Sequence, residues 1–360
     1  MNICIVFNHF QVQDGVGKTA IAIANALTLK PNTNVTLIPL YKYNSDLLSW
    51  LNPGVSVKPV FRGYFPGLSK LVSKLPMRLL NKILLDGKYD IQIGFCMSVP
   101  IKIVAAFREE DRNKCKRFSW MHGYDTGVSL LHEYKKIGKT VCVSQYNANR
   151  LREETGNSFD VECVYNPIDE ESILSMGNEH IEIEKSKYIQ LITVGRMSNE
   201  KGYTRLVKIL ARLKKDGYQF SLWMIGDGIE KETIEKYIKD NELVDDIHIL
   251  GQKANPHAYT AKADLFVCSS YSEGYSTACT EAVILGTPVL TTNVSGGEEI
   301  ICEAESGKLV EIDDESLYKG LKEVFDNPNV IQEWKSKLSQ TKSRFYYLNR
   351  IKKLYDVLGV

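Results

Sequence analysis

Short apolar runs alternate with longer amphipathic stretches along most of the chain. In the first half, the apolar runs predict strands at 2–7, 34–39, 91–95, 117–121 and 140–143, and a further strand begins at 160. Amphipathic stretches between them predict helices at 20–29, 99–108 and 147–154. Because strands and helices alternate, we expect an α/β fold with a parallel sheet flanked by helices.

A second alternating series begins at residue 188. It predicts strands at 188–194, 220–225, 247–250, 265–268 and 288–291, and helices at 203–214, 229–241 and 256–262. The polar stretch 170–187 reads as a linker. We therefore expect two Rossmann-like domains, 1–168 and 169–341. The stretch 326–358 is helical in character, and about 342–360 is expected to cross back to the first domain.

The composition fits an ordinary folded protein with an uneven charge distribution. The chain has 360 residues, of which 44% are apolar and 25% charged, and its net charge is +1. Residues 1–170 carry 21 Lys and Arg against 15 Asp and Glu, while residues 171–360 carry 24 against 29. The basic first half is therefore expected to face an anionic partner, such as phosphates, a lipid surface or an acidic glycan.

The eight cysteines are scattered and form no Cys-x-x-Cys pair. Most lie in apolar runs, where a free cysteine acts as a small hydrophobic residue. We expect a reduced, cytoplasmic protein rather than a disulfide framework or a zinc site. The N-terminus resembles a first strand more than a signal peptide, and no apolar run of about 18 residues predicts a membrane-spanning helix.

Two glutamates eight positions apart, Glu273 and Glu281, mark the most informative stretch of the chain. A strand at 265–268 precedes them, and a helix at 276–285 ends at Gly286 and Pro288. The loop between strand and helix would present unpaired backbone N–H groups, which form an anion site at a helix N-terminus. The two carboxylates would accept hydrogen bonds from hydroxyl groups, so a sugar phosphate is the expected ligand.

Two more strand ends are expected at the same edge of the second sheet. Arg196 and Lys201 lie between Gly195 and Gly202, directly after a strand and before a helix. Open α/β sheets bind ligands at the carboxyl ends of their strands, where these cations would meet phosphate oxygens. Gly226-Asp227-Gly228 also follows a strand, which by itself is a weak signal.

The first domain offers two weaker signals. Gly15, in Asp14-Gly15-Val16-Gly17-Lys18-Thr19, lies in a loop that ends like a phosphate-binding P-loop, but Val12 stands where that motif requires glycine. An ATPase is therefore not expected, although such a loop lets backbone approach a ligand. His122 follows an apolar run and is expected at the carboxyl edge of the first sheet, where it would face a cleft between the two expected domains.

Residues 58–85 contain six Lys and Arg and no acid. Four of the cations recur every fourth residue beside a stripe of leucines, namely Lys70, Lys74, Arg78 and Lys82. The pattern predicts a basic amphipathic helix, interrupted at Pro76. Such a helix either docks on an anionic membrane or simply has a solvated charged face.

Taken together, these motifs resemble the family 4 retaining glycosyltransferases. The resemblance is strongest at 188–310, through Gly195-Arg196 with Lys201-Gly202, Gly226-Asp227-Gly228, and the Glu273-x7-Glu281 element. It implies the GT-B fold, in which two Rossmann-like domains face each other across a cleft. One departure is the first loop, which usually reads Gly-Gly-x-Glu in the family and here contains Asp14, so the role of this loop stays open.

The resemblance also implies roles for the site residues. Arg196 and Lys201 would neutralise the diphosphate leaving group, Glu273 and His122 would contact the donor sugar, and Glu281 would hold the ribose hydroxyls. The remaining donor-binding candidates are Gly15, Gly195, Gly226, Gly228, Lys253, Gly274, Tyr275, Ser276 and Thr277. No metal or cofactor is expected, and no Asp-x-Asp motif occurs.

The expected activity is transfer of a hexose-type sugar, with retention, from a nucleotide-sugar to a glycan or lipid-linked glycan of a surface polysaccharide. UDP is the expected nucleotide, and no nucleic-acid partner is expected. A GDP-mannose-dependent mannosyltransferase, a GT-B epimerase and a non-catalytic GT-B subunit stay open as alternatives. The protein is expected in the cytoplasm, with peripheral contact to the inner membrane face as a hypothesis.

Overall fold

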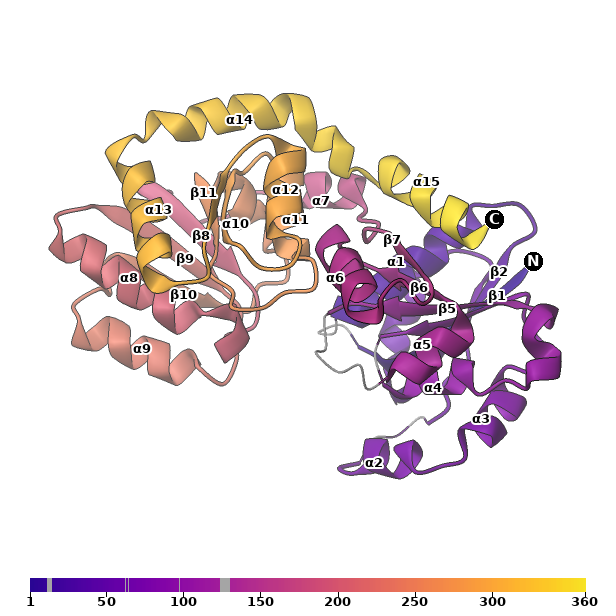
Figure 1. Cartoon of the computed structure of the whole chain (residues 1–360). Helices are drawn as coiled ribbons and strands as arrows, with labels where there is room; N and C mark the ends of the chain where they lie inside the picture. Colours follow the sequence, from indigo (N-terminus) through magenta and orange to yellow (C-terminus); the bar gives the residue numbers. More distant parts are fainter. Residues whose placement is uncertain (12–14, 62, 64, 97, 124–129) are drawn as a thin grey trace. The chain divides into compact units, whose positions relative to one another are not determined.

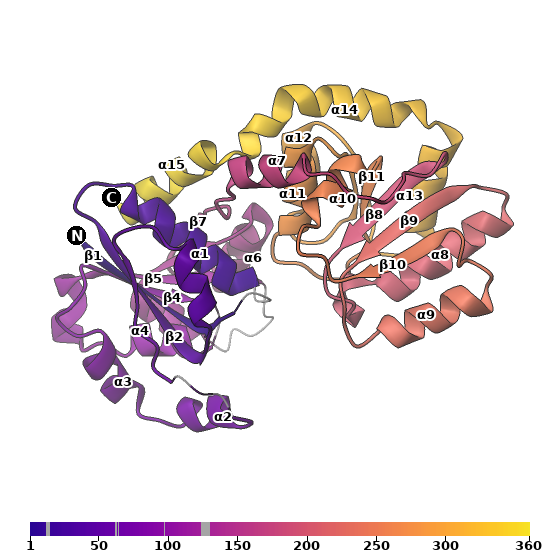
Figure 2. The same ribbon diagram turned by 180° about the vertical axis from the view of Figure 1, so that it is seen from behind.

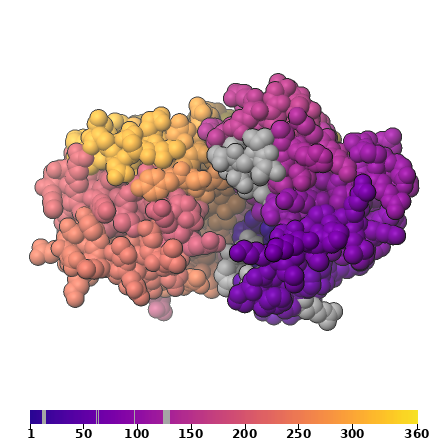
Figure 3. Space-filling view, turned by 60° about the horizontal axis from the view of Figure 1, so that its bottom comes forward, coloured from indigo at the N-terminus to yellow at the C-terminus, as the bar shows by residue number. Residues whose placement is uncertain are grey.

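The computed structural model describes residues 1–11, 15–61, 63, 65–96, 98–123 and 130–360; the others are drawn grey in Figures 1 and 3. The chain divides into two compact units: a first unit, Met1–Pro167 with Leu348–Val360, and a second unit, Ile168–Tyr347. The sequence places the division at 168/169, and the return of the chain at about 342. The return begins at 348 because Lys342–Phe345 stay in the second unit, where Phe345 is buried.

The first unit contains a seven-stranded sheet in the order β3-β2-β1-β4-β5-β6-β7, with parallel pairing of every neighbour (Figure 1). Its strands are β1 (Asn2–Phe10), β2 (Asn34–Tyr43), β3 (Val55–Val57), β4 (Ile91–Phe95), β5 (Lys116–Met121), β6 (Lys139–Cys142) and β7 (Asp160–Cys163). Its helices are α1 (Gly15–Thr28), α2 (Leu68–Ser73), α3 (Met77–Leu84), α4 (Val99–Ala105), α5 (Leu131–Ile137), α6 (Gln145–Thr155) and α15 (Tyr347–Leu358).

Hydrogen bonds and an ion pair connect the C-terminal helix α15 to the rest of the first unit. The Tyr355 hydroxyl donates to the Ala26 carbonyl of α1 at 2.7 Å. Lys116 Nζ donates to the Leu358 carbonyl at 3.1 Å and thereby satisfies the C-terminal end of α15. Lys353 Nζ lies 2.9 Å from a carboxylate oxygen of Glu162.

The second unit contains a six-stranded parallel sheet in the order β10-β9-β8-β11-β12-β13. Its strands are β8 (Ile189–Val194), β9 (Phe220–Ile225), β10 (Ile247–Gly251), β11 (Leu265–Cys268), β12 (Val289–Thr292) and β13 (Lys308–Val310). Its helices are α7 (Glu170–Gly177), α8 (Tyr203–Lys215), α9 (Lys231–Asp240), α10 (His257–Lys262), α11 (Thr277–Leu285), α12 (Gly297–Ala304), α13 (Asp314–Asp326) and α14 (Asn329–Thr341).

Helices cover both faces of the second sheet. Helices α8, α9 and α13 pack together on one face, and α7, α10, α11 and α12 lie on the other (Figures 1 and 2). The spacing of Leu206, Leu210 and Leu213 places them on one side of α8, and all three are fully buried in the core beneath it. The two parallel Rossmann-like sheets confirm the predicted α/β class.

The expected linker at 170–187 is partly wrong. Residues Glu170–Gly177 form helix α7, which packs against α10 and α11 of the second unit. The Asp169 side chain accepts a hydrogen bond from the Ser172 N–H at 3.1 Å and caps the helix, while Ile173 is buried. The high polarity of this segment reflects a helix with one narrow buried stripe.

The basic segment forms two short helices, α2 and α3, and the second begins directly after Pro76. This confirms the predicted interruption, because proline lacks the N–H group that a continuous helix needs. Within the described parts of the chain, no helix combines the length and the apolar character needed to cross a membrane.

Candidate active site

The second sheet brings two loops together at the point where its strand order changes direction. From β8 the chain proceeds outward to β9 and β10 and then returns to the other side of β8 to form β11. The loop after β8 carries Lys201, and the loop after β11 carries Glu273. Such switch points at the carboxyl ends of parallel strands are where open α/β sheets bind ligands.

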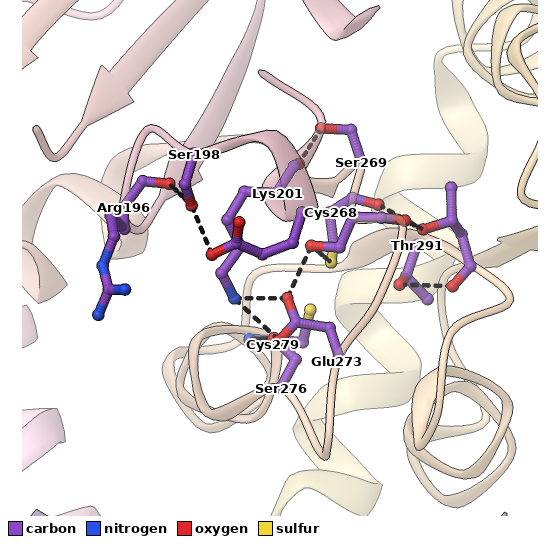
Figure 4. Close-up of polar contacts among 12 residues, drawn as sticks. Arg196, Ser198, Lys201, Cys268, Ser269, Glu273, Ser276, Cys279 and Thr291 are labelled. Atoms are coloured by element: carbon purple, nitrogen blue, oxygen red, sulfur yellow. Dashed lines mark hydrogen bonds and ion pairs between the residues drawn. The ribbon is translucent and has the colours of Figure 1, made fainter. Parts of the chain in front are cut away.

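Lys201 and Glu273 form an ion pair at this point (Figure 4). Lys201 Nζ lies 2.7 Å and 2.8 Å from the two carboxylate oxygens, and the Ser270 hydroxyl donates to Glu273 Oε1 at 2.6 Å. The Lys201 side chain is 28% exposed and that of Glu273 10%. Burial opposes the charged amine, but the Glu273 carboxylate outweighs it and holds the pKa of Lys201 above its ordinary value.

Arg196, the other expected cation, is exposed and stands apart from this pair in Figure 4. Its guanidinium has no hydrogen bond or ion pair among the residues described. Nearby, the Ser198 hydroxyl donates to Glu200 at 2.6 Å, and this bond, helped by the charge of Arg196, lowers the pKa of Glu200. We call the edge formed by the loops after β8 and β11 the rim. Among the described residues of these two loops, Arg196 is an unpaired cation and Lys201 is a cation neutralised by Glu273.

The glycines at this edge allow the loops to cross each other closely. A Cβ on Gly226 would lie 1.8 Å from the Gly195 carbonyl oxygen, and one on Gly228 would lie 2.2 Å from that of Met197. A Cβ on Gly195 would lie 2.8 Å from the Tyr203 hydroxyl. All three glycines were expected to let the backbone approach a donor. In the structure they instead allow close contacts within the protein.

The loop from Gly274 to Thr277 leads into α11. The Ser276 side chain caps this helix by accepting a hydrogen bond from the Cys279 N–H at 3.3 Å. Tyr275 is 6% exposed and packs against Gly296, where a Cβ would lie 2.6 Å from the ring. Helix α11 therefore begins at the rim with its N-terminal N–H groups, as an anion site requires.

The loop between β12 and α12 also reaches this rim. No residue of this loop was among the predicted site residues. The Ser295 hydroxyl donates to the Gly274 carbonyl at 2.8 Å. Gly296, in the left-handed conformation at φ +77°, lets this loop pass close to Tyr275. The signal available in the sequence was Ser295-Gly296-Gly297, a run of small residues directly after a strand.

Glu281 lies on α11, one turn beyond the cap. One of its carboxylate oxygens is 3.8 Å from Nδ1 of His257, the first residue of α10. His257 was not among the predicted site residues, because nothing in its surrounding sequence marks a strand end. Lys253, expected near the nucleotide base, is exposed, and its Nζ lies 5.8 Å from the centre of the Tyr259 ring.

In the first unit, His122 follows β5 and contacts the edge of Phe95, with 4.3 Å between ring centroids. Burial lowers the pKa of His122 to about 3, so the imidazole is neutral near pH 7. Its Nε2 atom has no hydrogen-bond partner among the described residues. Gly15 is the first residue of α1, where a Cβ would meet no atom within 4 Å, and Asp14 lies outside the described residues.

Among the residues that the structure describes, no group of three or more His, Cys, Asp or Glu side chains is arranged to hold a metal ion.

Most of the second unit matches a known protein family. Residues 178–341 match the family described as Glycosyl transferases group 1. Over 199 residues the chain is 33% identical to the N-acetylgalactosamine-N,N'-diacetylbacillosaminyl-diphospho-undecaprenol 4-alpha-N-acetylgalactosaminyltransferase of Campylobacter jejuni, covering 55% of this chain and 52% of that protein. The aligned segment spans about half the length of the first curated relatives.

Solved structures resemble the whole chain. A glycosyltransferase from Rickettsia africae has a TM-score of 0.76 at 18% identity, with 99% of this chain and 97% of that chain covered. The HepE protein of Anabaena, in complex with UDP and glucose, has a TM-score of 0.73 at 17% identity, with 100% and 99% covered. At these identities the likeness shows a common fold. The chain therefore has the GT-B fold, and its residues 178–341 match the group 1 glycosyltransferases.

Proposed function

We propose that this protein is a retaining glycosyltransferase that moves a hexose-type sugar from a nucleotide-sugar to a glycan or lipid-linked glycan. The Lys201–Glu273 ion pair at the switch point of the second sheet carries this proposal. The pair joins a cation, the type of group that binds phosphate, to a carboxylate, the type of group that accepts hydrogen bonds from hydroxyls, and a sugar diphosphate offers both phosphate and hydroxyl groups. The match of residues 178–341 to the group 1 glycosyltransferases supports the same reaction.

In this proposal the donor replaces the contact between the two charges. The diphosphate takes Lys201 together with the unpaired Arg196, and Glu273 then accepts hydrogen bonds from the sugar hydroxyls. Glu281 holds the ribose, and the N–H groups at the start of α11 face the distal phosphate. A neutral His122 suits a hydrogen bond to the sugar, since it keeps one donor and one acceptor nitrogen.

The proposed chemistry needs no protein nucleophile. The acceptor hydroxyl attacks on the face from which the diphosphate departs, and a phosphate oxygen takes the hydroxyl proton. The protein then contributes positioning and stabilisation of the leaving group. We propose that Arg196 and Lys201 supply this stabilisation without a metal ion.

We propose UDP as the donor nucleotide, and GDP-mannose is the second candidate. The UDP and glucose bound to HepE, which shares the fold, support UDP. The acceptor proposal draws on the Campylobacter relative, whose name specifies a diphospho-undecaprenol-linked substrate. Surface polysaccharide biosynthesis in the cytoplasm would supply such acceptors.

Release of nucleotide from a panel of UDP- and GDP-sugars, with and without a lipid-linked acceptor, tests the proposed function. We expect release that the acceptor accelerates, and a loss of about 10²-fold in turnover for Arg196→Ala and for Lys201→Ala. Lys208→Ala, which removes an exposed lysine of α8, is the control. Wild-type turnover in both variants would refute the diphosphate assignment, and nucleotide release without sugar transfer would indicate the epimerase alternative. No release from any donor would indicate a non-catalytic subunit.

We further propose that α2 and α3 contact an anionic membrane. The acid-free stretch 58–85 carries Lys70, Lys74, Arg78 and Lys82. Large apolar side chains of the same two helices are exposed, with Leu71 at 54%, Leu79 at 52% and Ile83 at 56%. Exposed apolar groups beside cations are typical of helices that lie in a lipid interface.

Flotation with vesicles containing anionic lipid tests this contact. We expect reversal of the four cations of α2 and α3 to glutamate to abolish flotation. The matched control reverses four exposed lysines of α8 and α9, namely Lys208, Lys215, Lys236 and Lys239. Because both variants have the same net charge, equal flotation of the two would refute a specific surface.

A further inference from the structure

Arg205 is a buried cation of the second unit to which the proposed function assigns no role. It is the third residue of α8 and only 3% exposed. Its guanidinium donates through Nε to the Ser269 carbonyl at 2.8 Å and through Nη2 to the Ser270 carbonyl at 2.9 Å. A third bond runs from Nη1 to the Ile312 carbonyl at 3.1 Å.

The guanidinium has little charge compensation at this place. Its nearest carboxylate oxygen, on Asp314, is 3.9 Å away, and that side chain is 68% exposed. The ring of Tyr271 stacks on it, with 3.9 Å between Cζ and the ring centroid. Burying a weakly paired cation costs free energy, and an apolar side chain would fill the space at lower cost. What only arginine supplies is a rigid planar fork that binds two consecutive carbonyls at once.

The two carbonyls belong to the segment that carries Glu273. From this segment, the Ser270 hydroxyl donates to Glu273 Oε1, as described above. The Tyr271 N–H donates to the Glu200 carbonyl at 2.7 Å, and the Ser269 hydroxyl donates to the Lys201 carbonyl at 3.0 Å. The loop that carries Lys201 and the segment that carries Glu273 are thus joined on both sides of the ion pair.

Gly202 makes this junction possible. It adopts φ +65°, and a Cβ there would lie 2.2 Å from the Ser269 carbonyl oxygen and 2.9 Å from Arg205 Nε. The Thr292 hydroxyl also donates to the Ser270 carbonyl, at 2.6 Å. Arg205 thus holds the carbonyls of Ser269 and Ser270 beside the start of α8, while Thr292 holds the Ser270 carbonyl beside β12.

We propose that Arg205 is a positioning residue, whose guanidinium sets the place of Glu273 opposite Lys201. The inference rests on the proposed function, because it assigns Glu273 to the transfer step. Arg205 acts on Glu273 through the backbone of Ser269 and Ser270, whose carbonyls it binds, and not through the Glu273 carboxylate itself. Its loss therefore lowers the rate of transfer more than the affinity for the nucleotide, which Glu281 and Arg196 would hold.

The test compares Arg205→Lys with Arg212→Lys. Arg212 lies two turns further along α8, stacks over Tyr318 at 3.6 Å and pairs with Glu315, but contacts no part of 269–273. A displacement near 1 Å lowers rates on the order of 10²-fold. We expect that loss in kcat for Arg205→Lys, with a nearly unchanged Kd for UDP, and wild-type kinetics for Arg212→Lys.

Two further measurements distinguish positioning from a general loss of structure. The backbone amides of 270–276 should exchange hydrogen faster in Arg205→Lys and at the wild-type rate in Arg212→Lys. In a Glu273→Gln background, Arg205→Lys should cost little additional kcat, because its effect passes through Glu273. An additive loss in that background, or unchanged exchange, would overturn the proposal.

A second variant covers the case in which Arg205→Lys does not fold. Tyr271→Leu removes the ring over the guanidinium from a side chain that is 43% exposed, and should show the same exchange pattern more weakly. If it does not, the proposal fails. If the wild-type protein releases nucleotide from no donor, the proposed function fails instead, while the exchange of 270–276 still decides the role of Arg205.

Discussion

Lys201 and Glu273 neutralise each other in an ion pair. A charged ligand can therefore bind either side chain only if the contact between the two side chains is broken. A diphosphate gains Lys201 only by displacing a carboxylate at 2.7 Å, and the freed carboxylate must then find new donors. A nucleotide-sugar supplies both partners, because it carries the diphosphate and the hydroxyl groups. A bare phosphate supplies only the first, which favours the complete donor.

At the residue scale we predict that Lys201→Ala destabilises the second unit by about 2 kcal/mol, because it leaves the Glu273 carboxylate without its cation. The double variant Lys201→Ala/Glu273→Ala should cost less than the sum of the single variants. Since the pKa of Lys201 is raised in the folded state, its stabilising contribution is complete at neutral pH and up to the ordinary value of 10.5, and is then lost as pH rises through the raised pKa. Urea unfolding at several pH values measures this, and additive costs would contradict it.

His122 should give the opposite pH dependence. Its pKa is lowered to about 3, so between that value and the unfolded pKa near 6.5 the unfolded chain binds one more proton. The first unit should therefore lose stability as pH falls from 6.5, and His122→Gln should reduce this loss. His132→Gln, at an exposed position, is the control, and an equal acid sensitivity of wild type and His122→Gln would contradict the prediction.

The sequence predicted Lys201 and Glu273 at one sheet edge, because each follows a strand that pattern alone identifies. It did not predict their direct contact, since they lie 72 positions apart and meet only if β8 and β11 are neighbours. Strand order is a tertiary property that periodicity does not contain. Arg205 was missed for a related reason. The sequence does not distinguish an arginine that is buried on a helix from one that is exposed.

At the element scale, the ends of β8 and β9 are held together by the crossing of their loops. The Met197 N–H donates to the Asp227 carbonyl at 2.9 Å, and the Gly195 N–H donates to the Ile225 carbonyl at 3.0 Å. These bonds require backbone contact without intervening side chains, which explains the glycines at both loops. The Gly-Arg and Gly-x-Gly motifs are therefore needed for the loop conformation before any ligand arrives.

We predict that Gly226→Ala destabilises the second unit by about 3 kcal/mol or more, because the new Cβ overlaps the Gly195 carbonyl and φ is +142°. Gly217→Ala is the matched control. Gly217 also has a positive φ, +94°, but open space around its Cβ, so it should cost only about 1 kcal/mol. Equal midpoints for the two variants in urea unfolding would show that the overlap is relieved.

The shortest elements escaped prediction from the sequence. Strands β3 and β13 have three residues each, too few for an alternating pattern to be recognised. Helix α7 was taken for linker because only Ile173 among its residues is buried. The longer strands of both sheets were predicted within a few residues, because strands covered on both faces are continuous apolar runs.

At the scale of the whole molecule, the first unit is built from two separate segments of the chain. Residues 1–167 build its sheet, and 348–360 add α15 after the second unit is complete. The first unit is therefore finished only by the last part of the sequence. Since each unit has its own core, the contribution of α15 should appear in one unit alone.

We predict that deleting residues 348–360 destabilises the first unit by several kcal/mol and leaves the second unit unchanged. The deletion exposes the surface that Ile351, Leu354 and Leu358 cover, and a buried aliphatic side chain contributes about 1.5–3 kcal/mol. Hydrogen exchange resolves the two units separately, with β1 and β4 reporting on the first and β8 and β11 on the second. Leu348→Ala, at a side chain that is 72% exposed, should leave both at wild-type rates. Faster exchange in β8 and β11 of the deletion variant would show instead that α15 stabilises both units, and the assignment of residues 348–360 to the first unit alone would fall.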